Sequence, residues 1–565
     1  MVFGRNLWKR SRGSARWAGK ESNTGSGKTQ TEARPGPKDR LVLLLVLGGL
    51  AELIYVYFFV RPYPLLRYYA TPLLDLGKIA GRSRLSAAAF ATAFLLLFAL
   101  YYIGYRLCFG QDSPHWPWTM LAFTTIFSLT LLFVYPIGAA DIFDYIIHGR
   151  ILAHYRLNPF VHTASEFPND PLTPYVAWRN IPSVYGPLWA CLDAGTNFLA
   201  GSADLLANLW AFKVLAIFFY ILDTGLIYSI LAEIRPAYAL PGAFLFAWNP
   251  LLLFETAANG HNDSVMMFCT LLAIFLLLKR KPILSIIALI CSAMIKFITI
   301  ILWPFFLVSL LALGESKASP EGESPEKAGP GEFQEQARRS PLAIWLSSPE
   351  WRRRGTSLLV YSLVSFGIMA LFYAPFWTGW GTIPLRQRLG MFTNSLPTLI
   401  MLLLRIWLDV GQARRLVGWL SLAALGFFGL TRWVRLASQK SDRMAYHDHG
   451  PLILASLDMI LFYLLFTCTW LQPWYLVWLV ALAALVPDLD TAHQAVLFTY
   501  TMTWAYVVYQ FVWFWYIPAM NWMNRLGVHS LAVGATLVAP WAFSAYLLWK
   551  RRNSSRRQCL RGSRR

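Results

Sequence analysis

The sequence predicts an all-α fold, a polytopic membrane protein of about 12 to 14 transmembrane helices. Apolar runs long enough to cross a hydrocarbon layer of roughly 30 Å recur along most of the 565 residues. Charged residues make up only 14% and hydrophobic residues 56% of the chain, whereas a soluble domain has about 25% charged residues. A water-soluble globular protein is therefore excluded.

The net charge of +21 is concentrated at the two ends of the chain. Residues 1–40 hold ten Lys and Arg residues against three acids, and residues 550–565 hold eight and no acid. Each basic segment flanks an apolar run, which is typical of juxtamembrane segments on the cytoplasmic side. We therefore expect both termini in the cytoplasm, membrane lipids as neighbours, and no nucleic-acid partner.

Composition divides the chain into five regions. The segment 1–40 is rich in Gly, Ser and Lys, and 314–354 is rich in Glu, Pro, Gly and Arg, so both are expected to be disordered. The expected regions are a cytoplasmic tail (1–40), an N-terminal transmembrane region (41–313) with a long loop at 139–186, a cytoplasmic linker (314–354), a C-terminal transmembrane region (355–549) and a basic cytoplasmic tail (550–565).

Three spans are expected near 41–60, 86–108 and 117–138. With a cytoplasmic N-terminus, the third span brings the loop 139–186 to the extracytoplasmic side. Hydropathy leaves two points open. The stretch 186–236 is either one long span or three short ones, and the piece 398–412 either crosses the membrane or lies on its outer surface.

The long loop begins with two acids, in the segment AADIFDYIIHGR. Asp141 and Asp144 share one face if the segment is helical. An acidic pair where a span meets the membrane surface is a functional candidate, because a charge there is costly unless water, a partner or a function keeps it. The alternative is structural: the acids anchor the interface and cap the helix, with Arg150 as an ion-pair partner.

A second polar group follows the apolar run near Asn249 and includes Glu255 and the segment NGHND. Asn259 and Gly260 are explained by a turn, in which Asn-Gly is favoured. His261 and Asp263 are not needed for a turn and could hydrogen-bond sugar hydroxyls or phosphate oxygens. Helix capping is the structural alternative for Asp263.

Two further groups are predicted on the same side of the membrane. Lys296, Arg386 and Arg388 are cations that oppose the positive-inside tendency, and such cations often pair with an anion, here a phosphate. In the segment QPWY a proline interrupts an apolar run, so Trp474 is either an interfacial belt residue or a platform for a sugar or a lipid head.

All four groups are predicted on the same side of the membrane. Together they favour one reaction, the transfer of a sugar from a lipid phosphate to an acceptor hydroxyl. One carboxylate would take the hydroxyl proton as the oxygen attacks the anomeric carbon, and the cations would stabilise the departing phosphate.

Several short motifs make the sequence similar to a known family. Through the order and spacing of these motifs, residues 120–490 resemble the GT-C superfamily of integral-membrane glycosyltransferases. The resemblance is strongest to the bacterial polyprenol-phosphate-mannose-dependent α-mannosyltransferases that build lipoglycan cores. The motifs are Asp141–Tyr145, His148–Arg150, Asn158–Phe160, Tyr185–Leu188, Asn259–Asp263, Lys296–Phe297 and Gln472–Tyr475.

The resemblance implies a GT-C-like fold with a long first extracytoplasmic loop and an inverting transfer of a hexose, with mannose expected, from a polyprenyl phosphate to a glycolipid or lipid-linked glycan. It implies that Asp141 is the general base, with Asp144 as the second choice for that role. The residues expected to bind substrate are Tyr145, His148, Arg150, Tyr185, Asn259, His261, Asn262, Asp263, Lys296, Arg386, Arg388, Gln472, Trp474 and Tyr475.

The sequence assigns no cofactor. Asp144 is expected to assist Asp141 or to bind a metal, because some branches of the superfamily use a divalent ion. Two carboxylates could supply oxygen ligands, but they are too few to decide. The six cysteines have no CxxC spacing, so neither a disulfide framework nor a zinc site is expected.

A transporter or flippase for a lipid-linked saccharide is the alternative from another functional class. It would use the same polar residues for recognition and would place others near the bilayer midplane, where Asp223 and Asp458 are candidates. A protein O-mannosyltransferase is a further alternative, although the chain lacks a soluble module for handling polypeptide.

Overall fold

The computed structural model describes residues 37–315, 349–383, 390–438, 450–516 and 522–562. Most of the predicted tail 1–40 and most of the predicted linker 314–354 lie outside the described residues. Arg386 and Arg388 also lie outside them.

The predicted all-α, polytopic membrane class is confirmed. The described residues form helices and no strand, with two isolated bridges at Pro64–Val134 and Thr393–Trp470. Seven helices are long and apolar enough to cross a membrane, and the pair Pro236–Ala247 and Pro250–Ala258, bent by 51°, counts as an eighth. The lower end of the expected 12 to 14 is reached only when the four shorter apolar helices are counted as well. The seven spans are Asp39–Val60, Arg84–Leu107, Leu205–Ile234, Gly355–Phe376, Val410–Ala437, Gly450–Thr467 and Asn524–Lys550.

The first helices match the predicted spans near 41–60 and 86–108. A short loop of two one-turn helices joins these spans, and the Ser83 hydroxyl caps the second span by accepting a hydrogen bond from Ser86 N. The elements are α2 (Pro37–Tyr55), the π-helical turn η2 (Val56–Val60), α3 (Leu65–Tyr68), α4 (Leu76–Ile79), α5 (Arg84–Leu107) and α6 (His115–Leu131).

The loop 139–186 contains a buried helix, α7 (Asp141–Ala153), and the short turns η3 (Ala164–Glu166) and η4 (Thr173–Tyr175). The stretch 186–236 forms a short helix, α8 (Pro187–Leu199), and one long span, α9 (Leu205–Ile234). This answers the first point that hydropathy left open. Helix α7 packs against α8, so the loop is built into the helical bundle.

The bent pair and the helices after it bring the second polar group to the bundle. The break falls at Asn249, whose side chain accepts hydrogen bonds from Leu251 N and Leu252 N and so caps the second piece. The elements are α10 (Ala239–Ala247), α11 (Pro250–Leu253), the π-helical turn η6 (Phe254–Ala258), α12 (Asp263–Leu278), α13 (Pro282–Ile295), η7 (Phe297–Leu302) and α14 (Trp303–Glu315).

The second half continues the bundle. The piece 398–412 is divided between the nine-residue helix α19 and the start of the span α20. The elements are α17 (Pro349–Tyr373), η8 (Ala374–Phe376), η9 (Trp380–Thr382), α19 (Leu396–Leu404), α20 (Val410–Ala437), α21 (Gly450–Phe462), η11 (Tyr463–Thr467), η12 (Pro473–Tyr475), α22 (Leu476–Ala483), α23 (Asp490–Met502), α24 (Trp504–Val507), η13 (Val508–Val512), α25 (Trp513–Tyr516) and α26 (Trp522–Gly562).

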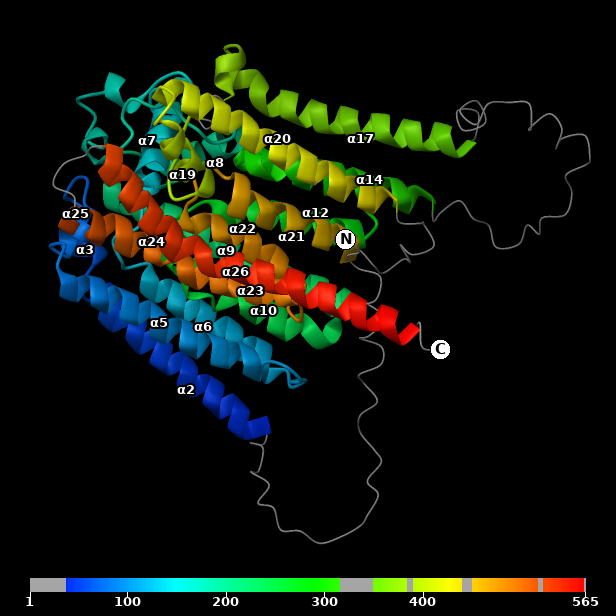
Figure 1. Cartoon of the computed structure of the whole chain (residues 1–565). Coiled ribbons are helices and arrows are strands. Elements are labelled where there is room, and N and C mark those ends of the chain that lie inside the picture. Colours follow the sequence, from blue (N-terminus) through cyan, green and yellow to red (C-terminus); the bar gives the residue numbers. More distant parts are fainter. Residues whose placement is uncertain (1–36, 316–348, 384–389, 439–449, 517–521, 563–565) are drawn as a thin grey trace, which may run out of the picture.

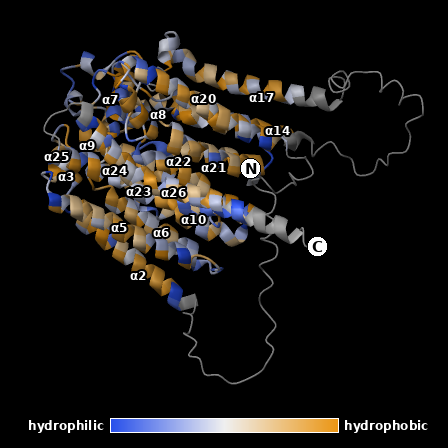
Figure 2. Ribbon diagram, in the orientation of Figure 1, coloured by the Kyte–Doolittle hydropathy of each residue, from blue (hydrophilic) through white to orange (hydrophobic). Residues whose placement is uncertain are grey.

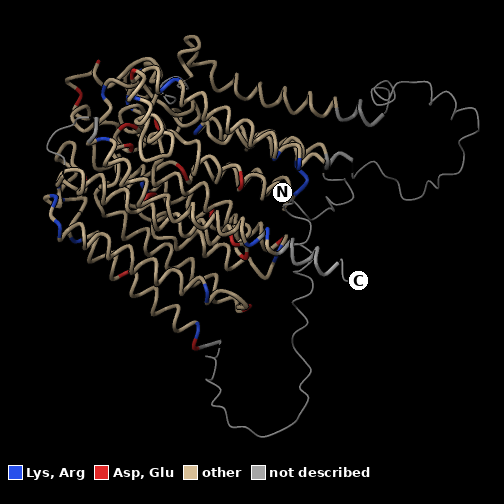
Figure 3. Tube along the Cα trace, viewed as in Figure 1, with Lys and Arg blue, Asp and Glu red and all other residues tan. Residues whose placement is uncertain are grey.

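The long helices run side by side and give the molecule two distinct ends (Figure 1). Helices α3, α7, α19 and α25 gather at one end, at the left of Figure 1, and we call this the site end. The first residues of α2 and the last of α14 and α26 lie toward the other end. Apolar residues dominate the long helices (Figure 2), and Lys, Arg, Asp and Glu gather mainly near both ends of the bundle (Figure 3).

Candidate active site

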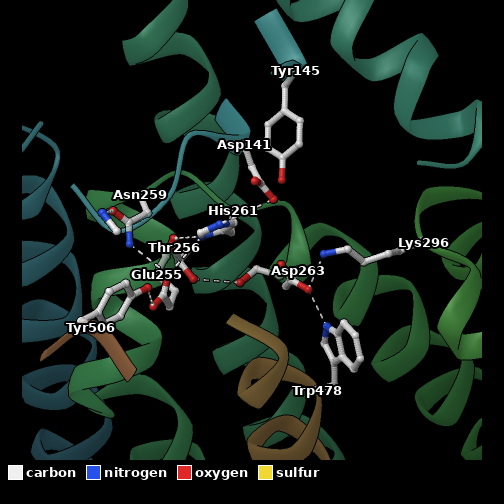
Figure 4. A network of polar contacts seen from close by, with 12 residues as sticks. Asp141, Tyr145, Glu255, Thr256, Asn259, His261, Asp263, Lys296, Trp478 and Tyr506 are labelled. Carbon is white, nitrogen blue, oxygen red and sulfur yellow. Dashed lines mark hydrogen bonds and ion pairs between the residues drawn. The ribbon is translucent and has the colours of Figure 1, made fainter. Parts of the chain in front are cut away.

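The structure brings Asp141 and His261 together at the site end. The Oδ2 atom of Asp141 lies 4.0 Å from Nε2 of His261, although 120 positions separate the two residues in the sequence. The Asp141 side chain is 18% exposed and the imidazole is 1% exposed. Asp141 is in the first turn of α7, where the helix dipole favours a negative charge. Figure 4 shows the carboxylate directed at the imidazole.

Two tyrosines form a hydrogen-bonded series with Asp141. The hydroxyl of Tyr185 donates to Asp141 Oδ2 at 2.9 Å, and the hydroxyl of Tyr145 lies 3.3 Å from that of Tyr185. The ring of Tyr145 packs edge-on against Tyr185 and Trp189, which fixes both hydroxyl groups. Tyr145 and Tyr185, both expected to bind substrate, therefore lie beside the partly exposed Asp141.

The two acids of the long loop have different environments. Asp144 is buried, and its Oδ1 atom has no hydrogen-bond partner among the described residues. Burial raises the pKa of Asp144 well above its usual value, and the nearby charge of Asp141 raises it further, against a backbone hydrogen bond from Trp178. Burial therefore disfavours the charged form of Asp144, and Asp141 is the more accessible member of the pair.

The far end of α7 leads away from this site. Arg150 lies nine residues after Asp141, roughly 13 Å along the helix axis. Its guanidinium is 2.5 Å from Asp170 Oδ2 and donates to Ser202 at 2.7 Å. His148 is buried, and burial lowers its pKa to about 4, so the imidazole is neutral. The structure therefore does not bring Arg150 to Asp141.

A buried carboxylate, Glu255, organises His261 from the opposite side. Nδ1 of His261 lies 3.1 Å from Glu255 Oε2 and 3.2 Å from the Glu255 carbonyl oxygen. Both oxygens are acceptors, so Nδ1 carries a hydrogen and Nε2 faces Asp141. Asn259 Nδ2 donates to Glu255 Oε2 at 2.9 Å, and the Tyr506 hydroxyl donates to Oε1.

The local backbone explains how Glu255 and His261 meet. Glu255 lies in the π-helical turn η6, and the chain then reverses at Gly260, which has a φ of +74°. The left-handed backbone at Gly260 favours glycine, and a Cβ there would also lie 2.6 Å from Ile142 Cδ1, so that side chain would have to shift. The Gly138 N–H donates to Asn259 Oδ1 at 3.0 Å and ties the turn to the chain before α7.

Charge and stacking both act on the His261 ring. Burial alone would lower the pKa of His261, but the hydrogen bond to Glu255 and the charges of Glu255 and Asp141 raise it above its usual value. The ring of Trp474 stacks on the imidazole at 4.1 Å with an interplanar angle of 17°. An imidazolium is favoured over an aromatic face. Trp474, for which the sequence left two interpretations open, therefore lies at the site.

A buried ion pair adjoins this centre. Lys296 Nζ lies 2.7 Å from Asp263 Oδ1, which also accepts a hydrogen bond from Trp478 Nε1 (Figure 4). The ammonium is 5.6 Å from the ring centres of Tyr185 and Tyr475 and 5.7 Å from that of Trp478. Lys296 is thus a buried cation among aromatic rings, one tyrosine away from Asp141.

Several buried polar atoms at this centre have no hydrogen-bond partner within the described part of the chain. They belong to three consecutive residues: Nε2 of His261, both side-chain polar atoms of Asn262, and Oδ2 of Asp263. Buried polar groups in proteins are nearly always satisfied. Their concentration here indicates a place where a ligand or water completes the hydrogen bonding.

The described residues offer no group of three or more His, Cys, Asp or Glu side chains placed to hold a metal ion. Asp144, expected either to assist catalysis or to bind metal, is buried. We therefore derive no step through a metal.

Of the remaining residues predicted to bind substrate, one lies next to the site and two lie outside the described residues. Gln472 precedes the turn η12 that carries Trp474 and Tyr475, while Arg386 and Arg388 lie outside the described residues. Sequence reasoning placed Glu255 in the second polar group without giving it a role, and it did not single out Tyr506 or Trp478. An acid inside the apolar run PLLLFETAANG was the available signal for Glu255.

Comparisons with known proteins support the resemblance expected from the sequence. The chain matches a family described as "Alpha-(1->6)-mannopyranosyltransferase, N-terminal domain" over residues 63–312. It is also 24% identical over 200 residues to the alpha-(1->6)-mannopyranosyltransferase A of Corynebacterium glutamicum, and the match covers 34% of this chain and 40% of that protein. The chain thus matches less than half the length of this relative. The family match includes Asp141, Glu255, His261 and Lys296, and these comparisons confirm that the chain resembles a GT-C mannosyltransferase.

Proposed function

We propose that this membrane protein is an inverting mannosyltransferase. It moves a mannosyl unit from a polyprenyl-phosphate donor to a hydroxyl group of a glycolipid or lipid-linked glycan on the extracytoplasmic side. Two observations support the proposal: the resemblance to mannopyranosyltransferases and the geometry of the Asp141–His261 centre. The observation that matters most is that the accessible carboxylate of Asp141 lies 4.0 Å from the buried imidazole of His261. Buried polar atoms without a hydrogen-bond partner among the described residues lie at the same centre.

Asp141 is the general base of the proposed reaction. As the acceptor oxygen attacks the anomeric carbon, Asp141 Oδ2 takes the hydroxyl proton, and the bond from the anomeric carbon to the phosphate oxygen breaks. The polyprenyl phosphate leaves with the bonding electrons, so the configuration at the sugar inverts. The Tyr185 hydroxyl already donates to the same carboxylate oxygen and holds it in place.

Among the residues that the structure describes, His261 and Lys296 are cations placed to meet the leaving phosphate. His261 is favoured as imidazolium by Glu255 and Asp141, and its Nε2 atom faces the space beside Asp141. Lys296 is held by Asp263 within an aromatic surround. A cation that is fixed before the reaction stabilises the developing phosphate charge without reorganisation.

The surroundings of the site favour a lipid-bound donor. The centre lies at one end of a bundle of apolar helices, so a prenyl chain could remain in the bilayer while its phosphate reaches Lys296 and His261. The basic segments 1–40 and 550–565 adjoin helix ends away from the site end, which favours a cytoplasmic location for both termini and an extracytoplasmic site.

The transporter alternative depends on Asp223 and Asp458. Asp458 lies 3.3 Å from Arg432 in an ion pair, which gives it a structural explanation. Asp223 is buried within the long span α9, and its oxygens have no hydrogen-bond partner among the described residues. Because the larger polar network is at one end of the bundle, the geometry favours an enzyme.

The decisive experiment is a transfer assay with the purified full-length chain. The protein in liposomes is incubated with radiolabelled polyprenyl-phosphate mannose and a membrane lipid extract, and labelled glycolipid is measured. We expect product from the unchanged chain and from Glu166→Gln, an exposed acid in the same loop, but none from Asp141→Asn. Donor movement across the bilayer without a new product would instead favour the transporter.

A further inference from the structure

The loop between the first two spans, residues 61–84, is strongly basic, and we call it the basic loop. It contains Arg61, Arg67, Lys78, Arg82 and Arg84. Its only acid, Asp75, caps α4 and lies 3.6 Å from Lys78 Nζ. Within the part of the chain that the structure describes, its four arginines form no ion pair. The loop therefore presents cationic charge that no described carboxylate neutralises.

The basic loop lies at the depth of lipid headgroups. The first span ends at Val60 and the next begins at Arg84, so Arg61 and Arg84 are at the membrane ends of two neighbouring helices. Arg61, Arg67 and Arg84 are all exposed. The phosphate groups of the leaflet on the site side lie at this same depth. This is so whichever compartment the site end faces.

Exposed apolar side chains accompany these cations. Tyr57 is 57% exposed with Arg61 above its ring, and Leu66 is exposed beside Arg67. Arg84 lies 5.8 Å from the ring centre of Trp515. Aromatic and basic side chains together are typical of the boundary between headgroups and acyl chains. A lipid surface is thus a better fit to the basic loop than a soluble protein partner.

The backbone of the loop is held rigidly at Arg82. This residue has a φ of +51°, a left-handed conformation that is rare for a side chain of this size. Its N–H donates to Gly77 O at 2.8 Å, its carbonyl accepts from Trp515 Nε1, and its guanidinium lies 3.5 Å from the Phe514 ring centre. Strained residues persist where the surrounding structure fixes them, often for binding.

We propose that the basic loop, through Arg61, Arg67 and Arg84, binds the headgroups of anionic phospholipids in the leaflet on the site side. Arginine suits this ligand because its guanidinium is always charged and is attracted to the anionic phosphate. The loop also adjoins the candidate active site: Leu76 N donates to Ile137 O at 3.1 Å, next to Gly138, which bonds Asn259. The lipid surface and the active site are therefore neighbours that can be tested separately.

The test uses the full-length chain in liposomes with a phosphatidylglycerol analogue that carries a photo-crosslinking group on its headgroup. Crosslinks are mapped by peptide mass spectrometry and compared with those of a matching phosphatidylcholine analogue. We expect phosphatidylglycerol to label the basic loop in preference to phosphatidylcholine. In R61Q/R67Q/R84Q the labelling at subsaturating lipid should fall about fivefold for each cation removed.

Two further variants make the result decisive. R61K/R67K/R84K keeps the charge and should keep most of the preference for phosphatidylglycerol. R106Q removes an exposed arginine from the opposite end of α5 and should leave labelling of the basic loop unchanged. Equal labelling by the two lipids, unchanged labelling in the glutamine variant, or loss of labelling in the lysine variant would each overturn the proposal.

Discussion

The Oε2 atom of Glu255 lies 3.1 Å from Nδ1 of His261, so a buried carboxylate orients the imidazole that faces Asp141 and favours its protonated form. This arrangement resembles a carboxylate–histidine pair in which the second ring nitrogen is left for substrate. Glu255 therefore acts on the imidazole of His261 and does more than stabilise a turn. Its removal should alter the pH dependence of the reaction.

Glu255→Gln keeps the shape of the side chain and removes its charge. Because Glu255 raises the pKa of His261, the substitution lowers that pKa, and the imidazolium is lost at a lower pH than in the unchanged protein. We expect the alkaline limb of the pH–rate profile to move toward lower pH and transfer at pH 7 to fall about tenfold. Initial rates measured across the pH range provide the check. An unshifted limb would show that Glu255 does not set the charge of His261.

Asp141→Asn and Asp144→Asn should have very different effects. Asp141 is the proposed base, and its loss should lower the rate of transfer by about 10² to 10⁴. Asp144 is buried, and burial raises its pKa and disfavours its charged form, so an uncharged amide of the same shape should change the rate by only a few fold. Single-turnover rates and donor binding are measured for both variants. Equal losses of rate would contradict the assignment of Asp141 as the base.

The buried pair Lys296–Asp263 should show strong coupling. Lys296→Met leaves the Asp263 carboxylate buried without its cation, and the loss of one partner of such a pair costs about 3 to 5 kcal/mol. Asp263→Asn leaves the ammonium without its carboxylate. The double variant should be less destabilised than the sum of the single variants, as unfolding in denaturing detergent can measure. Simple additivity would argue against a coupled pair.

Gly186 should not tolerate even a methyl group. A Cβ atom there would lie 1.9 Å from the Met294 carbonyl oxygen, and the Gly186 N–H donates to Ile295 O at 3.0 Å. Gly186→Ala must therefore push α8 away from α13 and displace Tyr185, and we expect a stability loss of about 1 to 3 kcal/mol together with reduced transfer.

Gly195→Ala is the matched control, because Gly195 lies within α8, the helix that Gly186 precedes, and its Cβ would meet nothing within 4 Å. Alanine favours a helix over glycine by about 0.8 to 1.0 kcal/mol. Thermal unfolding midpoints should therefore fall for Gly186→Ala and stay level or rise for Gly195→Ala. The same result for both would mean that close packing at Gly186 is unimportant.

The sequence predicted the membrane class and the shared side of Asp141 and His261, because hydropathy locates spans and spans determine which loops share an end. It could not predict which polar residues pair. Glu255 and Tyr506 meet across 251 positions, and no local pattern encodes such a contact. Arg150 shows the opposite: it is close to Asp141 in the sequence, but in the structure it pairs with Asp170. Only packing distinguishes these two outcomes.

The hydrogen bond from Tyr506 to Glu255 has a consequence for how the chain can be divided. Glu255 comes before residues 316–348 and Tyr506 comes after them, so each half of the protein contributes one partner. A fragment that ends at Glu315 would carry Asp141, His261 and Lys296 but would lack the phenol that steadies the carboxylate behind the imidazole. Separately produced halves would regain that bond only by reassociating, which makes fragment complementation a direct readout of their assembly.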